Sequence, residues 1–105
     1  MLDLRFLLAV SRPRFWLYIL GPYLVGLAAG ASTVAEMTSV TAIVFGIYFL
    51  FPANLMIYGV NDVYDFETDR LNPKKRDYEL LVKPEAHRPL LITIAALNLP
   101  FVITA

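Results

Sequence analysis

Three long runs without a charged side chain dominate the hydrophobic pattern of this sequence. They cover residues 15–35, 37–61 and 89–105, which are 21, 25 and 17 residues long. A helix needs about 20 mainly apolar residues to cross a bilayer, so the first two runs are long enough and the third is close. The pattern therefore predicts an all-α integral membrane protein, a helical bundle with about three transmembrane helices in this chain.

Two further features refine these spans. The first run contains Gly21-Pro22 and is followed by a second full-length run, so it does not fit a cleaved signal peptide. Pro22 and Pro52 are expected to interrupt helices within the membrane. Residues 1–12 are apolar with a few charges, which is typical of a short helix lying at the membrane interface.

The basic residues predict which ends of the spans share a side of the membrane. Three arginines precede the first run, and the other six Lys and Arg residues lie between the second and third runs. Two crossings return the chain to its starting side, so both basic regions fall on one face, which the positive-inside rule makes cytoplasmic. We expect a protein of the cell (inner) membrane whose N-terminus and 62–88 loop are cytoplasmic.

Composition narrows the possible functions. The formal net charge is zero, so no long-range field favours nucleic acid. The chain has no cysteine and one histidine, which excludes a cysteine-based zinc site and a histidine metal site within it. Candidate chemistry must therefore come from the carboxylates.

Carboxylates are concentrated directly after the second apolar run, in the stretch NDVYDFETD (61–69). If the second helix continues past Asn61, then Asp62, Asp65 and Asp69 fall at i, i+3 and i+7, within roughly 60° of one another on one stripe. Tyr58 would share this stripe, whereas Glu67 would point elsewhere into solvent.

Aligned like charges destabilise a helix unless a counter-charge is present. Magnesium prefers carboxylate oxygens together with substrate phosphates and water, so Asp62, Asp65 and Asp69 could hold a Mg²⁺ ion and, through it, a diphosphate. Basic side chains nearby would take the remaining phosphate charge. The apolar membrane interior next to these charged residues would suit a molecule that has a hydrocarbon tail and a diphosphate head.

Other residues are weaker candidates for contact with the diphosphate or the substrate. They are Asn61, Tyr58, Asn54, Arg14, Lys74, Lys75 and Arg88. Each also has a simpler interpretation: a polar residue within a span usually contacts another helix, and arginines beside a span usually anchor and orient it. We prefer membrane anchoring for Arg12 and a loop position for His87.

Alternative functions follow from the same residues. Charge-rich loops that flank membrane helices are commonly just solvated. Acidic groups at a membrane edge can also mark an ion path, which would make the chain part of a cation transporter, although the spans themselves contain no acid. A non-catalytic membrane subunit is the third possibility.

The motif itself carries a specific resemblance. NDVYDFETD matches the NDxxDxxxD pattern of the UbiA superfamily of intramembrane prenyltransferases, and RLNPKKRD and HRPL are similar to the loop of that family. The segments SRPRFWLYILGPYLVG and YFLFPANLMIYGVND resemble its lycopene elongase-like branch.

This resemblance implies a larger bundle of transmembrane helices and a reaction. A prenyl group would pass from a prenyl diphosphate to a hydrophobic acceptor, such as lycopene, a quinone precursor or a lipid, with Mg²⁺ as cofactor. By the match to the family's first motif, Asn61, Asp62, Asp65 and Asp69 would bind metal and diphosphate, with Asp62 and Asp65 the catalytic pair.

The chain departs from the family pattern because the second aspartate motif is absent. No residue after Arg88 is acidic. We therefore expect residues 1–105 to be the N-terminal part of a UbiA-like domain. We expect this part to be inactive alone and to need a second half that carries the other aspartate motif.

Overall fold

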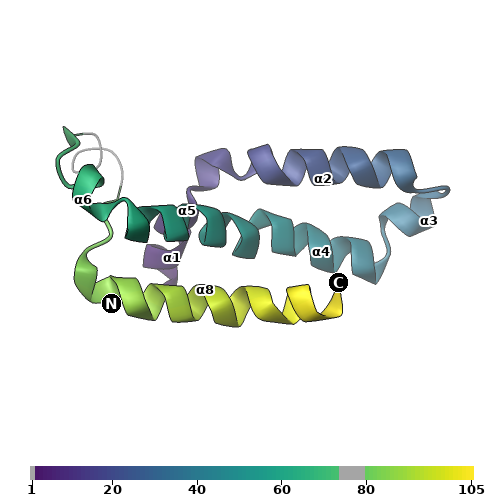
Figure 1. Ribbon diagram of the computed structural model, residues 1–105. Helices are drawn as coiled ribbons and strands as arrows, with labels where there is room; N and C mark the ends of the chain where they lie inside the picture. The colour runs from purple at the N-terminus through teal and green to yellow at the C-terminus, as the bar shows by residue number, and fades with distance from the viewer. Residues whose placement is uncertain (1, 74–79) are drawn as a thin grey trace.

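The computed structural model describes residues 2–73 and 80–105, and in these ranges the chain forms helices and turns but no strand (Figure 1). The all-α prediction is confirmed. The elements are α1 (Leu4–Ser11), the 3₁₀ turn η1 (Pro13–Phe15), α2 (Leu17–Gly30), α3 (Val34–Met37), α4 (Val40–Leu50), α5 (Pro52–Tyr64), α6 (Phe66–Asp69) and α8 (Pro84–Thr104).

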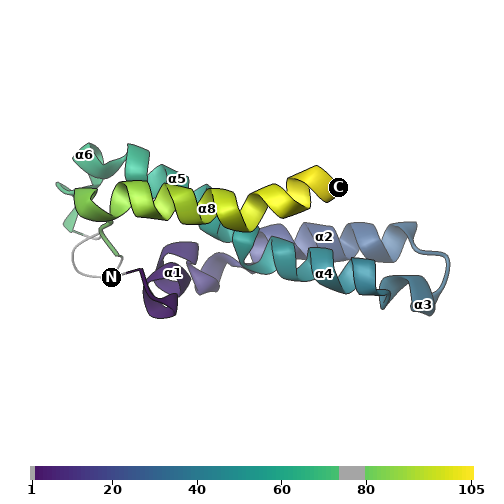
Figure 2. The ribbon, with the colours of Figure 1, turned by 90° about the horizontal axis from the view of Figure 1, so that it is seen from below.

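The elements form an elongated molecule that measures 50 × 25 × 20 Å (Figure 1). Helices α4 and α5 follow one another along the long axis, with α2 packed beside α4 and α8 beside α5. The short α3 lies at one end, and α6 lies at the other (Figures 1 and 2). The segments before α2, after α5 and before α8 lie in the half of the molecule nearer α6 (Figures 1 and 2).

Two stretches of helix are long and apolar enough to cross a membrane. They are Val40–Tyr64, with 25 residues and a mean hydropathy of 2.0, and Pro84–Thr104, with 21 residues and a mean hydropathy of 1.4. Only 28% and 22% of their apolar windows are buried, whereas a core helix of a soluble protein would be mostly buried. These exposed apolar surfaces need lipid or further protein to cover them, which supports a membrane protein.

Helix boundaries differ from the predicted spans. The first span was expected over 15–35, but α2 covers only the 14 residues Leu17–Gly30, because Ala31 adopts an extended conformation (φ −78°, ψ 139°). Pro22 lies inside α2 without ending it, so the interruption expected there was wrong. Helix α8 begins at Pro84 rather than at residue 89, which shortens the connection expected over 62–88.

Pro52 does separate α4 from α5, as expected. It has no backbone N–H to continue the hydrogen-bond ladder. The side-chain amide of Asn54 donates instead to the carbonyl oxygens of Phe49 (3.1 Å) and Leu50 (2.8 Å). The amide of Asn98 on α8 donates to the carbonyl oxygen of Pro52 (3.1 Å). Buried amides thus satisfy carbonyls at the break, where no water would be present in a bilayer.

The core lies in the half of the molecule nearer α6. The residues Val10, Leu55, Val82, Ala86, Leu90 and Ile94 are buried there, from α1, α5, the segment before α8, and α8. Helix α1 is the short N-terminal helix expected over residues 1–12, and Asp3 caps it by accepting a hydrogen bond from the Phe6 N–H (2.8 Å). It packs onto α5 and so extends the core.

Close packing at Gly59 gives a first prediction. A Cβ atom there would lie 2.7 Å from Ile94 Cδ1 and 3.4 Å from Val10 Cγ1. Gly59→Leu should therefore overpack the contact of α5 with α8 and α1, lowering the free energy of unfolding by about 1–3 kcal/mol. Thermal unfolding in nanodiscs measures this loss. Gly26→Leu on α2 is the control, because nothing lies within 4 Å of a Cβ there; equal losses in both variants would contradict the packing argument.

The two ends of the molecule give a test of topology. Val34 in α3 is 75% exposed, and the Glu67 side chain in α6 is 80% exposed, at the opposite end. The chain has no native cysteine, so Val34→Cys and Glu67→Cys can each be labelled alone. An impermeant maleimide applied to intact cells should label position 34 and spare position 67. Labelling of both positions from outside would overturn the predicted orientation.

Candidate functional site

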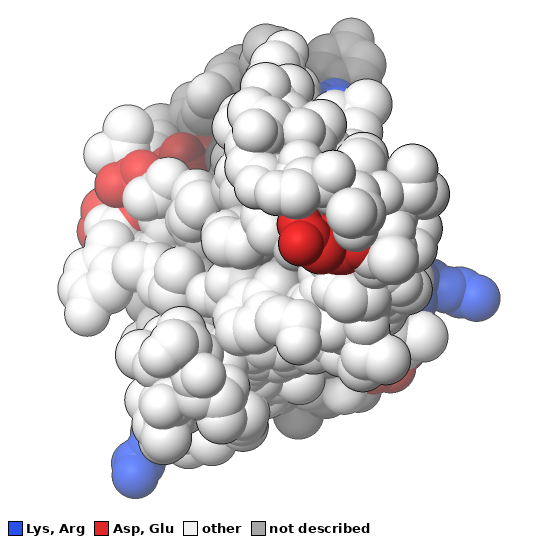
Figure 3. All heavy atoms as spheres, turned by 90° about the vertical axis from the view of Figure 1, so that its right-hand side faces the viewer, with Lys and Arg blue, Asp and Glu red and all other residues white. Residues whose placement is uncertain are grey.

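Charged side chains gather at the α6 end of the molecule. Helix α1 packs on α5 there, and the ring of Phe66 in α6 meets the ring of His87 in α8 edge-on, with centroids 5.4 Å apart. The opposite end, seen in Figure 3, shows few charged side chains among mostly uncharged atoms. The candidate site is therefore built where the basic N-terminal segment, the aspartate motif and the start of α8 come together.

An ion pair between Arg12 and Asp62 is the best-defined feature of this site. Arg12 Nη2 lies 2.7 Å from Asp62 Oδ1, and the two side chains are 19% and 4% exposed. The guanidinium carbon of Arg12 lies 4.7 Å from the ring centroid of Tyr58, one helical turn before Asp62 on α5. The expectation that Arg12 only anchors the membrane overlooked this pair.

One local feature of the sequence indicated that Arg12 would have a non-helical backbone conformation. Arg12 directly precedes Pro13, and a residue before proline disfavours the right-handed helical region. In the structure Arg12 ends α1 with φ 54° and ψ 74°, and its N–H donates to the carbonyl oxygen of Ala9 (3.2 Å). The pairing with Asp62, fifty residues away, has no local signal.

The three aspartates do not form one continuous helical stripe. Helix α5 ends at Tyr64, Asp65 adopts a non-helical conformation (φ −96°, ψ 10°), and α6 begins at Phe66. The carbonyl oxygen of Asp65 accepts hydrogen bonds from the N–H groups of Asp69 (2.8 Å) and Thr68 (3.1 Å), so the chain restarts a helix there. Our assumption of an unbroken helix was wrong, and the motif bends at its second aspartate.

This bend gives the carboxylates different surroundings. Asp62 is buried against Arg12, Asp65 is exposed, and Asp69 is half-buried. Across residues 2–73 and 80–105, no three His, Cys, Asp or Glu side chains are grouped closely enough to hold a metal ion. The predicted three-carboxylate cluster is thus not assembled, and the role of each aspartate as a ligand stays a prediction.

The donor set still fits magnesium. Mg²⁺ is usually held by one or two protein carboxylates, with water and substrate phosphates as the other ligands, so a group of three is not required. Asp65 is open to solvent at the end of the apolar helix α5, and Asp69 follows one turn later in α6. These two residues could hold the ion, with Asp62 reached only by displacing its contact with Arg12.

Other predicted site residues fall into distinct positions. Asn61 and Arg88 are exposed, on α5 and α8. Arg14 is exposed in η1, and its guanidinium carbon lies 4.7 Å from the centroid of the Phe15 ring. Tyr58 lies beneath Arg12 and so contacts the site indirectly. Lys74 and Lys75 lie outside the described residues.

Two residues have positions that differ from our interpretation. Asn54 was a candidate for contact with substrate, but it is fully buried and its amide group bonds the carbonyls at the Pro52 break. His87 was expected in a loop, but it lies in α8, where Nε2 is 2.8 Å from the carbonyl oxygen of Val82. Glu67 is exposed as expected and pairs with Arg70 at 2.8 Å.

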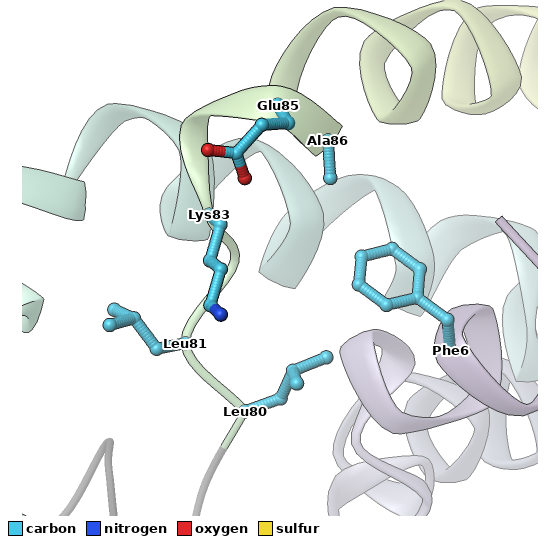
Figure 4. Close-up of a pocket in the computed structure, with 6 residues that line it drawn as sticks. All are labelled: Phe6, Leu80, Leu81, Lys83, Glu85 and Ala86. Carbon is cyan, nitrogen blue, oxygen red and sulfur yellow. The ribbon is translucent and has the colours of Figure 1, made fainter. Parts of the chain in front are cut away.

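A cavity of about 220 Å³ opens beside this site, between α1 and the start of α8 (Figure 4). Apolar side chains make up most of its wall, and Lys83 and Glu85 supply the charged groups; the lining residues are Phe6, Leu80, Leu81, Lys83, Glu85 and Ala86. None of the three aspartates lines it, so the cavity is separate from the motif.

Comparison with known proteins adds an independent line of evidence. No protein-family model and no solved structure matches the chain. A lycopene elongase/hydratase of Halobacterium salinarum is 46% identical over 98 residues, which are 93% of this chain and 36% of that protein. Proteins of the same name from Haloferax volcanii and Corynebacterium glutamicum are 51% identical over 74 residues and 35% identical over 101 residues.

The chain spans between a quarter and about a third of the length of these relatives. The match to the Halobacterium salinarum protein covers 93% of this chain, so the matched region includes the aspartate motif. The chain is thus similar, over nearly all of its length, to a part of the proteins named lycopene elongase/hydratase.

Proposed function

We propose that this chain forms the donor-binding part of a UbiA-type membrane prenyltransferase that elongates a carotenoid such as lycopene. One observation carries the proposal: the aspartate motif stands at the polar end of an apolar helix, in a chain similar to lycopene elongase/hydratases. A diphosphate head at the motif would leave its prenyl tail beside apolar side chains that the chain itself does not cover.

Different residues of this chain would bind the metal and the diphosphate. Asp65 and Asp69 would bind the metal, with Asn61 as a further polar contact. Arg14 and Arg88, both exposed, would contact the phosphate oxygens. Mg²⁺, when bound, would supply Lewis-acid stabilisation of the diphosphate leaving group. Lys74 and Lys75 stay candidates from the sequence alone.

The proposed prenyl transfer involves no net oxidation or reduction, so it needs no redox cofactor. The C–O bond between the prenyl group and the diphosphate breaks, and the diphosphate keeps the electron pair. Double-bond electrons of the acceptor form the new C–C bond, and the cation left on the acceptor is discharged by loss of a proton or by addition of water. An apolar environment protects the allylic cation from premature attack by water.

The experiment is a segment exchange into a full-length relative. Residues of this chain replace the aligned part of the Halobacterium salinarum protein, to which they are 46% identical. The chimera is reconstituted in liposomes with Mg²⁺, a radiolabelled prenyl diphosphate and lycopene. We expect label in a longer carotenoid, and no product when EDTA removes the divalent metal.

Two controls accompany this assay. The unmodified relative is the positive control, and replacing lycopene with an aromatic acid or a lipid alcohol tests the acceptor class. A chimera that inserts and folds but transfers no prenyl group to any acceptor would count against the proposal, and in favour of a non-catalytic membrane subunit.

A further inference from the structure

The cavity between α1 and the start of α8 has no part in the proposed function. Its volume is about 220 Å³, and none of the three aspartates of the motif lines it. Sites that enclose a whole small molecule usually measure about 300–1,000 Å³, so this cavity suits one end of a longer ligand. We call it the α1–α8 cavity.

The walls of the α1–α8 cavity are mainly apolar. Phe6, Leu80, Leu81 and Ala86 supply them (Figure 4). At about 30 Å³ per molecule, the cavity has the volume of about seven waters, which would find few hydrogen-bond partners on these walls. A hydrocarbon chain is a better occupant, because it loses no hydrogen bonds there and removes apolar surface from water.

Two charged side chains of opposite sign, Lys83 and Glu85, also line the cavity, and both are exposed. They lie two residues apart at the start of α8, a spacing at which side chains do not face each other. In the part of the chain that the structure describes, neither of them forms an ion pair. Figure 4 shows the Lys83 ammonium pointing away from the Glu85 carboxylate. A ligand can therefore contact a cation and an anion at once.

The position of the cavity along α8 indicates its depth in a membrane. Lys83, Glu85 and Arg88 lie at the start of the helix, whereas residues 89–105 carry no charge. A change from charged to apolar residues marks the level at which lipid headgroups meet hydrocarbon. A lipid of the adjoining leaflet has its phosphate and the beginning of its chains at this level.

We propose that the α1–α8 cavity binds one membrane phospholipid. The phosphate contacts Lys83, a hydrogen-bond donor of the headgroup contacts Glu85, and the first part of one acyl chain lies against Phe6 and Leu80. Phosphatidylethanolamine has all three groups, because its ammonium carries N–H donors for the carboxylate. Phosphatidylcholine has the same phosphate, but its quaternary ammonium has no N–H to donate.

Native mass spectrometry of the purified 105-residue protein in detergent measures the affinity for each lipid separately. The two lipids are used with identical acyl chains, so that only the headgroup nitrogen differs between them. We expect phosphatidylethanolamine to bind about threefold tighter than phosphatidylcholine, the size of one exposed ionic contact. Equal affinities for the two lipids would overturn the proposal.

Substitutions of the two charged residues should have different effects. Glu85→Ala removes the acceptor for the ammonium, so the ratio of the two affinities should fall to about one. Lys83→Gln removes the phosphate contact, so both lipids should bind about threefold weaker while their ratio is unchanged. The ratio is measured within one variant, so a general loss of stability does not imitate the effect at Glu85. A threefold ratio that persists in Glu85→Ala would refute the assigned contact.

Glu67→Ala and Arg70→Gln are the matched controls. They remove the same two kinds of charge from an exposed pair, 2.8 Å apart, that does not line the cavity. Both affinities and their ratio should stay as in the wild-type protein. Loss of the ratio in Glu67→Ala would show that the overall charge of this end of the molecule, rather than Glu85, selects the headgroup.

A soluble headgroup tests the contribution of the apolar walls. Glycerophosphoethanolamine has the phosphate and the ammonium but no acyl chain, so isothermal titration calorimetry should detect no binding at concentrations that saturate the protein with the lipid. Binding as tight as that of the lipid would mean that the cavity takes a soluble phosphate compound, which contradicts the proposal. Prenyl transfer by the chimera is measured independently, so neither result decides the other.

Discussion

Asp65→Asn is expected to reduce prenyl transfer by the chimera at least about 100-fold while leaving membrane insertion intact. The substitution removes one charge from an exposed carboxylate at the end of α5, and within residues 2–73 and 80–105 no ion pair like that of Arg12 with Asp62 is recorded for it. Loss of a metal ligand removes several kcal/mol of stabilisation from the departing diphosphate, and each 1.36 kcal/mol corresponds to a factor of ten. Product formation from a radiolabelled prenyl diphosphate measures the effect.

Glu67→Gln is the matched control for this substitution. It removes the same charge two residues away, from a side chain that is 80% exposed and paired with Arg70. Activity should stay within about twofold of the parent chimera, since exposed pairs contribute little. Similar losses of transfer activity in both variants would indicate that the overall negative charge of this region, rather than a metal ligand at Asp65, supports transfer.

Breaking the Arg12–Asp62 pair from one side is expected to cost about 3 kcal/mol in the free energy of unfolding. Either Arg12→Gln or Asp62→Asn removes this 2.7 Å contact from the other, largely buried charge, and such single removals cost about 3–5 kcal/mol in buried pairs. The lower figure applies because the Arg12 side chain is 19% exposed. Denaturant unfolding in nanodiscs, followed by circular dichroism, measures the loss.

The double variant makes this test specific. Arg12→Gln together with Asp62→Asn replaces both charges by amides, so its loss should be clearly smaller than the sum of the two single losses. Arg70→Gln breaks an exposed ion pair at the same end and should cost no more than about 1 kcal/mol. Additive losses in the double variant would mean that the pair contributes no interaction energy.

Much of the fold follows from the sequence because its strongest signals are local. A run of apolar residues long enough for a bilayer is helical whatever its neighbours, since the backbone must bond to itself in lipid. The Pro52 break could also be predicted, because proline lacks the N–H that continues a helix. Pro22 shows the limit of that rule, for α2 passes through it without interruption.

The site was predicted less completely, for two physical reasons. Its best-defined contact joins residues fifty apart, and a single sequence holds no periodic signal for such a pair. The bend at Asp65 occurs without glycine or proline, so spacing alone placed all three aspartates on one face. The sequence did indicate the end of the apolar helix at which the aspartates lie, whereas their chemistry stays a prediction.

The difference in helix length has a consequence for the surrounding lipid. At about 1.5 Å per residue, the 14 residues of α2 reach about 21 Å, whereas the neighbouring apolar stretch, from Val40 up to the residue before Asn61, reaches about 31 Å. A typical hydrocarbon layer is about 30 Å thick, so the longer stretch matches it and α2 is too short. Hydrophobic mismatch at α2 favours thinning of the bilayer around that helix. Acyl-chain length should therefore influence how this protein sits in a membrane, with short-chain lipids matching α2 better than long-chain lipids.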